Sequence, residues 1–163
     1  MILRPAVASD AAALAAIYRP AVETGTASFE EVAPDAEEMG RRLAAVLDRR
    51  LPWLVAEADG RVVGYAYASP FRERSAYRFT VEDSVYVSPA AQGRGVGRAL
   101  LEALIERCSG RELRQMVGAC GGGEPASIAL HERCGFRRVG AYERVGFKFG
   151  RELDVVLMQR ALS

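Results

Sequence analysis

The chain has 163 residues, carries 22 Lys and Arg against 21 Asp and Glu, and includes one His and three Cys. A chain of this length usually folds as one domain, so we expect a single domain over residues 1–163. Its hydrophobic content of 50% and charged content of 26% are typical of a folded globular protein rather than a disordered one. The formal net charge of +1 lacks the basic excess of a nucleic-acid-binding protein, so we expect no nucleic-acid partner.

Hydropathy and cysteine spacing indicate the cellular compartment of the protein. The longest apolar run, Ala11–Ile17, is far shorter than the roughly 20 residues of a membrane span. The first residues lack the basic and apolar regions of a secretory signal, so we expect no membrane association and a cytoplasmic location. Cys108, Cys120 and Cys134 are odd in number and lie at least 12 residues apart, which predicts buried free thiols and no metal site.

Hydrophobic periodicity predicts the elements of the first half of the chain. In chain order they are a strand over Ile2–Arg4, a helix capped by Ser9-Asp10 and ending near Glu23, a loop over Thr24–Pro34, a helix over Asp35–Arg50, and a hairpin of Trp53–Ala58 and Arg61–Ser69. The hairpin prediction rests on Asp59-Gly60, because Asp-Gly between two apolar runs favours a tight turn.

The second half alternates in the same way and completes a mixed α/β domain. In order we expect a strand over Phe79–Val87, a helix over Val96–Cys108, a strand over Leu113–Cys120, a helix over Pro125–Cys134, and final strands that contain Val139–Tyr142 and Val155–Met158. Pro125 suits the first turn of its helix, and Gly135 suits the C-terminal cap. The sequence contains no repeat or linker that would divide the chain.

A glycine-rich turn, Gln92–Gly97, separates a predicted strand from a predicted helix. Backbone N–H groups at a helix N-terminus have no intrahelical partner and the helix dipole is positive there, so a pyrophosphate fits. Arg94 and Arg98 could add charge-assisted hydrogen bonds. A flexible turn with solvated arginines is the alternative. The turn lacks the Gly-Lys-Ser/Thr of a Walker loop, and it comes too late in the chain for a dinucleotide fingerprint.

The order of several segments resembles the GNAT family of N-acetyltransferases, and within it the phosphinothricin and methionine sulfone acetyltransferase branch. The matching segments are Pro52–Glu57, Thr80–Pro89, Gln92-x-x-Gly95-x-Gly97, Ser127–Glu132, Gly135-Phe136 and Lys148–Gly150. The resemblance implies one GNAT-type α/β domain with a mixed central sheet and helices on both faces. It also implies direct acetyl transfer from acetyl-CoA to a primary amine of a small molecule, no metal, and a homodimer.

Carried over by position, the resemblance names residues that would contact acetyl-CoA. They are Val85, Tyr86, Val87, Gln92, Gly93, Arg94, Gly95, Val96, Gly97, Arg98 and Glu124. The backbone N–H of Val87 is the expected donor to the reacting carbonyl oxygen, where negative charge develops.

The strand before the glycine-rich turn carries the candidate base. Alternation places Thr80, Glu82, Ser84 and Tyr86 on one face and Phe79, Val81, Asp83, Val85 and Val87 on the other. A carboxylate held on a central strand either pairs with a cation or has a raised pKa suited to proton transfer. Glu82 could therefore pair with Arg74 or Arg78, or act as general base. The resemblance favours the base.

His131 is the only histidine and lies on the helix predicted after Glu124. A single His on such a helix is commonly a hydrogen-bonded structural residue. The family motif Ser127-x-x-Leu130-His131 instead implies a catalytic position, as a proton relay or an organiser of the site. Tyr86 and Tyr142 are the other possible acids, and both could equally be packing residues.

Two segments resemble the acceptor-binding loops of the family. The first contains Phe71, Arg72, Glu73, Arg74 and Tyr77, and an arginine fork suits a carboxylate or phosphinate. Solvated loop charges are the alternative. The second is Thr26–Glu30, with Phe29 as an apolar wall next to the acceptor.

Three departures from the family pattern bear on affinity and specificity. Glu124 stands where relatives have Asn, Phe71 stands where they have Trp, and Glu152 stands where Trp follows Lys148-x-Gly150. Glu124 brings an anion towards an anionic cofactor. A non-catalytic acyl-CoA-binding domain and an acetyltransferase of protein or peptide amines are therefore kept as alternatives to a small-molecule enzyme.

Overall fold

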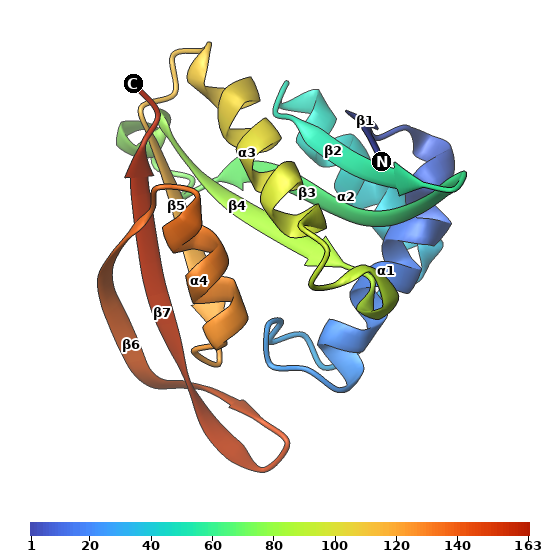
Figure 1. Ribbon diagram of the computed structural model, residues 1–163. Helices are drawn as coiled ribbons and strands as arrows, with labels where there is room; N and C mark the ends of the chain where they lie inside the picture. The colour runs from blue at the N-terminus through green and yellow to red at the C-terminus, as the bar shows by residue number, and fades with distance from the viewer.

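A seven-stranded mixed sheet forms the centre of the computed structural model, which describes residues 1–163 (Figure 1). The strand order is β1-β2-β3-β4-β5-β7-β6. The strands are β1 (Ile2–Pro5), β2 (Trp53–Ala58), β3 (Arg61–Pro70), β4 (Thr80–Val87), β5 (Gln115–Gly121), β6 (Arg137–Lys148) and β7 (Arg151–Ala161). The α-helices are α1 (Ala11–Glu23), α2 (Ala36–Asp48), α3 (Val96–Ser109) and α4 (Pro125–Arg133). The expected mixed α/β fold is confirmed.

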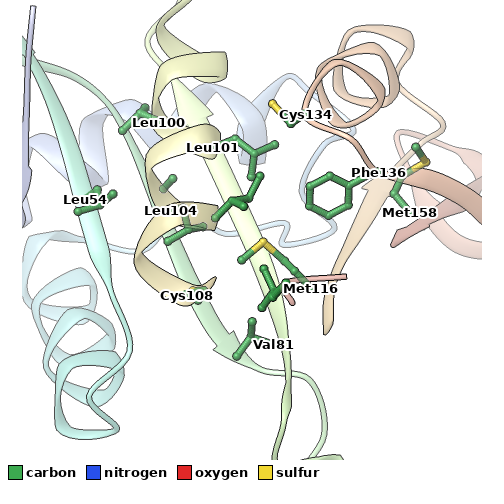
Figure 2. Close-up of a cluster of buried hydrophobic side chains, with 14 of the residues drawn as sticks. Leu54, Val81, Leu100, Leu101, Leu104, Cys108, Met116, Cys134, Phe136 and Met158 are labelled. Atoms are coloured by element: carbon green, nitrogen blue, oxygen red, sulfur yellow. The ribbon is translucent and has the colours of Figure 1, made fainter. Parts of the chain in front are cut away.

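Helices cover both faces of the sheet, and each face has its own hydrophobic core. Alternation along β2 sends Leu54 into the core beneath α3, and Trp53 and Val55 into the core beneath α1 and α2. Figure 2 shows the first core, where Leu100, Leu101 and Leu104 of α3 gather over the sheet with Met116. The two cores hold the central strands rigidly between the helical layers.

All neighbouring strands are antiparallel except β4 and β5, which are parallel. Their pairing covers only Thr80–Glu82 against Gln115–Val117, and the two strands diverge beyond Glu82. The alternation expected for β4 is confirmed, because Val81 and Val85 face the α3 core and Tyr86 faces the α1 core. The divergence leaves the C-terminal half of β4 without a neighbour on one side.

Local sequence explains most element boundaries. Asp35 caps α2 by accepting a hydrogen bond from the Glu38 N–H at 2.8 Å. Asp59 and Gly60 both have positive φ, at 51° and 72°, as a two-residue hairpin turn requires. Asp10 is the N-cap residue of α1, as predicted, but its side chain makes no capping hydrogen bond to that helix. The Asp10 carboxylate instead pairs with Arg4 and accepts from the Val7 N–H, and a short 3₁₀ turn, Ala8–Asp10, precedes α1.

The last hairpin is much longer than the sequence indicates. Strands were expected around Val139–Tyr142 and Val155–Met158, whereas β6 and β7 span 12 and 11 residues and project beyond the rest of the sheet (Figure 1). Register shifts between Arg138 and Gly140 and between Tyr142 and Gly146 break the two-residue alternation that identifies a strand. Strand β6 is also a sheet edge, so exposed side chains on it obscure the pattern further.

None of the helices combines the length and the apolar character that crossing a bilayer would demand. The three cysteines are free and buried, as expected.

Candidate active site

A cavity of about 1020 Å³ opens where β4 and β5 diverge. Its walls come from the end of α1 and the following loop, β4, the turn before α3, the end of β5, and α4. The predicted site residues that line it are Phe29, Glu82, Val85, Tyr86, Val87, Gln92, Gly93, Gly95, Val96, Gly97, Arg98, Glu124 and His131. Arg94 is exposed and does not line it. The fold thus gathers residues from the whole length of the chain around one cavity.

The glycine-rich turn forms one end of this cavity. Gly93 and Gly95 have φ of 74° and 81°, and Gly95 is the N-cap of α3. Such angles favour glycine and direct the first N–H groups of α3 outwards. Gly97 packs against Val85 and Val87, where an added Cβ would lie 3.6 Å from Val87. The residues present therefore fit a pyrophosphate. Arg98 is paired with Glu102 at 2.7 Å, so it faces along the helix.

The register of β4 directs further N–H groups into the gap. Ser88 donates to the Val63 carbonyl, and Phe71 donates to the Thr80 carbonyl. Because bonded pairs alternate in an antiparallel ladder, the even-numbered residues of β4 bond to β3. The N–H groups of Val85 and Val87 therefore point away from β3, towards the side that β5 leaves open.

Glu82 lies at the point where the two strands part. The side chain is half-buried, lines the cavity and forms no ion pair, so pairing with Arg74 or Arg78 is not observed. Burial and the neighbouring Asp83 charge raise the pKa of Glu82, and the charge of Arg72 opposes them. A carboxylate with a raised pKa is a stronger base than an ordinary Glu, which suits it to accept a proton.

Asp83 and His131 form a buried ion pair on the opposite face of β4. The His131 Nε2 lies 2.9 Å from Asp83 Oδ1, and Nδ1 lies 2.7 Å from the Ser127 carbonyl oxygen. A carbonyl oxygen and an ionised carboxylate both accept hydrogen bonds, so this geometry suits an imidazolium, in which both ring nitrogens donate. Burial opposes this charge, but the hydrogen bonds to Asp83 and Cys120 raise the pKa of His131 to about 10. The sequence reasoning selected His131 and missed Asp83, whose only signal was its position beside Glu82.

Gly118 of β5 leaves the space that this pair occupies. A Cβ at Gly118 would lie 2.5 Å from His131 Nε2 and 3.0 Å from Asp83 Oδ2, so the buried pair would have to move. We expect Gly118→Ala to destabilise the protein by about 1–3 kcal/mol, the usual range for overpacking. Thermal unfolding measures this. Gly140→Ala is the matched control, because a Cβ at Gly140 of β6 meets nothing within 4 Å. Equal melting temperatures for the two variants would contradict the expectation.

Glu124, the N-cap residue of α4, lines the cavity opposite the glycine-rich turn. Its carboxylate accepts a hydrogen bond from Thr26 Oγ1 at 2.5 Å. This contact ties the loop after α1 to the start of α4. The acidic residue is therefore engaged with the protein, although its charge remains on the cavity wall.

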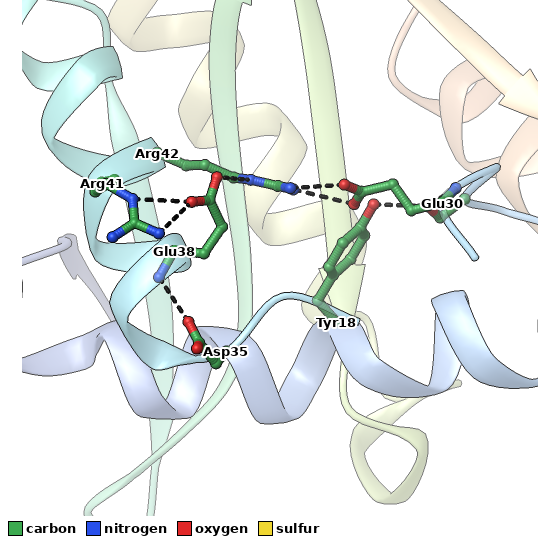
Figure 3. Close-up of polar contacts among 7 residues, drawn as sticks. Tyr18, Glu30, Asp35, Glu38, Arg41 and Arg42 are labelled. Carbon is green, nitrogen blue, oxygen red and sulfur yellow. Dashed lines mark hydrogen bonds and ion pairs between the residues drawn. The ribbon is translucent and has the colours of Figure 1, made fainter. Parts of the chain in front are cut away.

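The loop after α1 is held by several side chains, as Figure 3 shows for one side of it. Arg42 of α2 binds both carboxylate oxygens of Glu30, at 3.0 and 2.6 Å. Tyr18 of α1 hydrogen-bonds Ser28 at 2.6 Å. The expected wall residue Phe29 lies on the cavity and packs against Gly146 of the long hairpin.

The other predicted acceptor segment lies elsewhere. Arg72, Glu73, Arg74 and Tyr77 line a second cavity of about 760 Å³ at the start of β4, and Phe71 stacks on Tyr77 with ring centroids 5.6 Å apart. A 3₁₀ turn, Ser75–Tyr77, lies within this segment, and none of its predicted acceptor residues lines the main cavity. Of this segment, only Arg72 affects Glu82: its positive charge lowers the pKa of Glu82 and so partly offsets the rise caused by burial and Asp83. The exposed Tyr142 does not line the main cavity either.

Comparison with known proteins identifies related chains. A family model described as the acetyltransferase (GNAT) family matches residues 14–136. A phosphinothricin N-acetyltransferase of Alcaligenes faecalis is 58% identical over 155 residues, covering 94% of this chain and 79% of that protein. An L-methionine sulfoximine/L-methionine sulfone acetyltransferase of Pseudomonas paraeruginosa is 42% identical, covering 99% of this chain and 94% of that protein.

A solved structure agrees with these sequence relatives. It is a GNAT superfamily phosphinothricin acetyltransferase from Sinorhizobium meliloti in complex with AcCoA, with a TM-score of 0.97 and 48% identity over 99% of this chain and 88% of that one. The family match covers most of the chain, and the relatives align over nearly all of it. The chain therefore belongs to the acetyltransferase (GNAT) family.

Proposed function

We propose that the protein transfers the acetyl group of acetyl-CoA to the primary amine of a small amino-acid-like acceptor of the phosphinothricin, methionine sulfone or methionine sulfoximine type. The observation that carries the proposal is the unpaired, half-buried Glu82 beside the open N–H groups of β4. The names of the relatives reported above include acceptors of this class, and one relative was solved in complex with AcCoA. Both findings support this proposal.

Each step of this chemistry has a residue that suits it. The acceptor amine arrives as an ammonium and must lose a proton before its lone pair can attack, and Glu82 accepts that proton, directly or through water. The Val85 and Val87 N–H groups stabilise the negative charge that develops on the reacting carbonyl oxygen. The turn from Gln92 to Gly97 binds the pyrophosphate of acetyl-CoA, which supplies the acetyl group. His131 is paired with Asp83 and its pKa is raised, which supports a role in organising the site rather than in relaying protons.

A thiol-release assay with acetyl-CoA and a panel of amino acids tests the proposal. Phosphinothricin, methionine sulfone and methionine sulfoximine should each be acetylated, as free amines, faster than glutamate and methionine. Calorimetry of acetyl-CoA binding runs beside it. Saturable binding without turnover on any acceptor would favour the non-catalytic alternative, and turnover restricted to peptide N-termini would favour a protein acetyltransferase.

We propose further that the protein is a homodimer in which a second copy covers the long hairpin. Strand β6 has one unpaired edge, and exposed apolar side chains lie on it and on the turn that follows, namely Val139, Tyr142, Val145, Phe147 and, in the turn, Phe149. Unpaired edges with apolar side chains favour association. Light scattering should give twice the chain mass. Phe147→Asp should give the chain mass, whereas Ile2→Asp, at the exposed β1 edge, should not. A wild-type monomer would contradict the dimer.

We infer a cytoplasmic location from the three free, buried cysteines. Unpaired thiols are usual in proteins of reducing compartments. Fractionation of cells that express the protein tests this, since recovery outside the cytoplasmic fraction would contradict it.

A further inference from the structure

The chain has 22 basic residues, of which 21 are Arg and only Lys148 is Lys. Lys148 ends strand β6 and is 2% exposed, which makes it the most deeply buried cation of the protein. Charged side chains are rarely buried unless they are paired, yet Lys148 forms no ion pair within 4 Å. The single lysine of an arginine-rich chain therefore occupies a buried position without an ion-pair partner.

Its ammonium is satisfied by three backbone carbonyl groups. Lys148 Nζ donates to the carbonyl oxygens of Ala21 at 3.2 Å, Gly25 at 2.8 Å and Ser28 at 2.8 Å. An ammonium has three N–H donors on one compact nitrogen, so all three are used. Arginine presents its donors in a planar fork and cannot converge on three carbonyls around one point. The geometry therefore specifically suits lysine.

The three carbonyls belong to the wall of the main cavity. Ala21 lies in the last turn of α1, and Gly25 and Ser28 lie in the loop that follows; all three residues line the cavity. Lys148 itself does not line it. Two residues before Lys148, Gly146 makes room for the Phe29 ring, and an added Cβ at Gly146 would overlap that ring. The end of β6 therefore contacts this cavity wall on the side that faces away from the cavity, through Lys148 and Gly146.

Three other side chains also hold the loop in this wall. Tyr18, Arg42 and Glu124 bind Ser28, Glu30 and Thr26 respectively. Lys148 is the one side chain that binds backbone carbonyls of both the end of α1 and the loop, and the Gly25 N–H adds a backbone bond to the Pro20 carbonyl. Because the loop has no helix or strand ladder of its own, its path depends on such external donors.

We propose that Lys148 is a positioning residue for acceptor binding: its ammonium fixes the segment from Ala21 to Ser28, and hence Phe29, at the acceptor side of the cavity. This inference rests on the proposed acetyl transfer to a small amine. Lys148 has no contact with the glycine-rich turn, so its removal should weaken acceptor binding and leave acetyl-CoA binding intact.

Kinetics of three variants test the role. Lys148→Met should raise the KM for the acceptor about tenfold or more, since the hydrogen bonds of a charged donor are lost. Its kcat should fall less than its kcat/KM, and the Kd for acetyl-CoA should stay within about twofold, a change below 0.5 kcal/mol. Lys148→Arg should not restore the KM. Arg107→Met removes an exposed cation from α3, away from both the loop and the long hairpin, and should behave as wild type. An unchanged KM in Lys148→Met, or full activity in Lys148→Arg, would overturn the proposal.

Amine labelling tests the contact without any acceptor. With one lysine, the only amines that an acetylating reagent can modify are Lys148 and the chain N-terminus, and mass spectrometry separates the two. Lys148 should be protected in the folded protein and reactive in urea, and Tyr18→Phe, which loosens the loop, should increase its reactivity. Equal labelling of both amines in the folded wild type would overturn the proposal even if Lys148→Met fails to fold. Protection of Lys148 in a protein without turnover would instead count against the proposed function alone.

Discussion

Replacing Glu82 with Gln should lower kcat/KM by about 10²–10⁴-fold, the usual contribution of a general base. The amide cannot take the proton of the acceptor ammonium, whereas it keeps the size of the side chain. Binding of acetyl-CoA should be unchanged, because Glu82 lies at the divergence of β4 and β5 and the glycine-rich turn lies beyond the other end of β4. Steady-state kinetics and calorimetry on the same preparation measure both quantities.

The pH profile makes this test specific. Because burial and Asp83 raise the pKa of Glu82, the wild-type kcat/KM should fall as the pH drops through a value above the ordinary 4.5. The kcat/KM of the Glu82→Gln variant should not show this decrease at low pH. Glu106→Gln, an exposed carboxylate of α3, is the matched control and should match the wild type. Full activity of Glu82→Gln at every pH would show that another group accepts the proton.

Removing one member of the Asp83–His131 pair should have the largest effect on stability. His131→Gln leaves the Asp83 carboxylate buried without its cation, and such a loss usually costs about 3–5 kcal/mol. Asp83→Asn leaves an imidazolium without its anion, with a similar cost. The double variant should be more stable than the sum of the two single changes predicts, since neither charge remains. Denaturant unfolding of the four proteins gives the coupling energy, and strict additivity would contradict a paired charge.

The pH dependence of stability provides a second readout for the pair. The folded protein holds the His131 proton more tightly than the unfolded chain, because the pKa of His131 is raised from 6.5 to about 10. The stabilisation from this proton is therefore complete below pH 6.5 and is lost as the pH rises towards 10. The free energy of unfolding of the wild type should fall over that range relative to the double variant. Parallel curves would mean that His131 is neutral in the folded state.

Much of the molecule follows from local sequence. The hairpin at Asp59-Gly60, the cap at Asp35 and the phosphate-type turn at Gly93–Gly97 each depend on the backbone preferences of a few neighbouring residues, so the sequence by itself determined them. The family also followed from segments in a fixed order. The length of β6 did not, because its bulges and its exposed edge remove the alternation that identifies a strand.

The site needed the tertiary structure where its contacts join distant segments. The sequence left His131 as a proton relay or an organiser of the site, and its placement against Asp83, 48 residues away, favours the second role, because the pair raises the pKa of the ring. The loop with Arg72 and Arg74 matched an acceptor segment, yet its fold places it on a second cavity. In the sequence, Lys148 was only part of a short family motif. Its proposed positioning role follows from the burial of its ammonium against carbonyls more than 100 residues away. Sequence patterns report local backbone preferences, whereas the charge state and position of a buried group depend on partners that only the folded chain brings together.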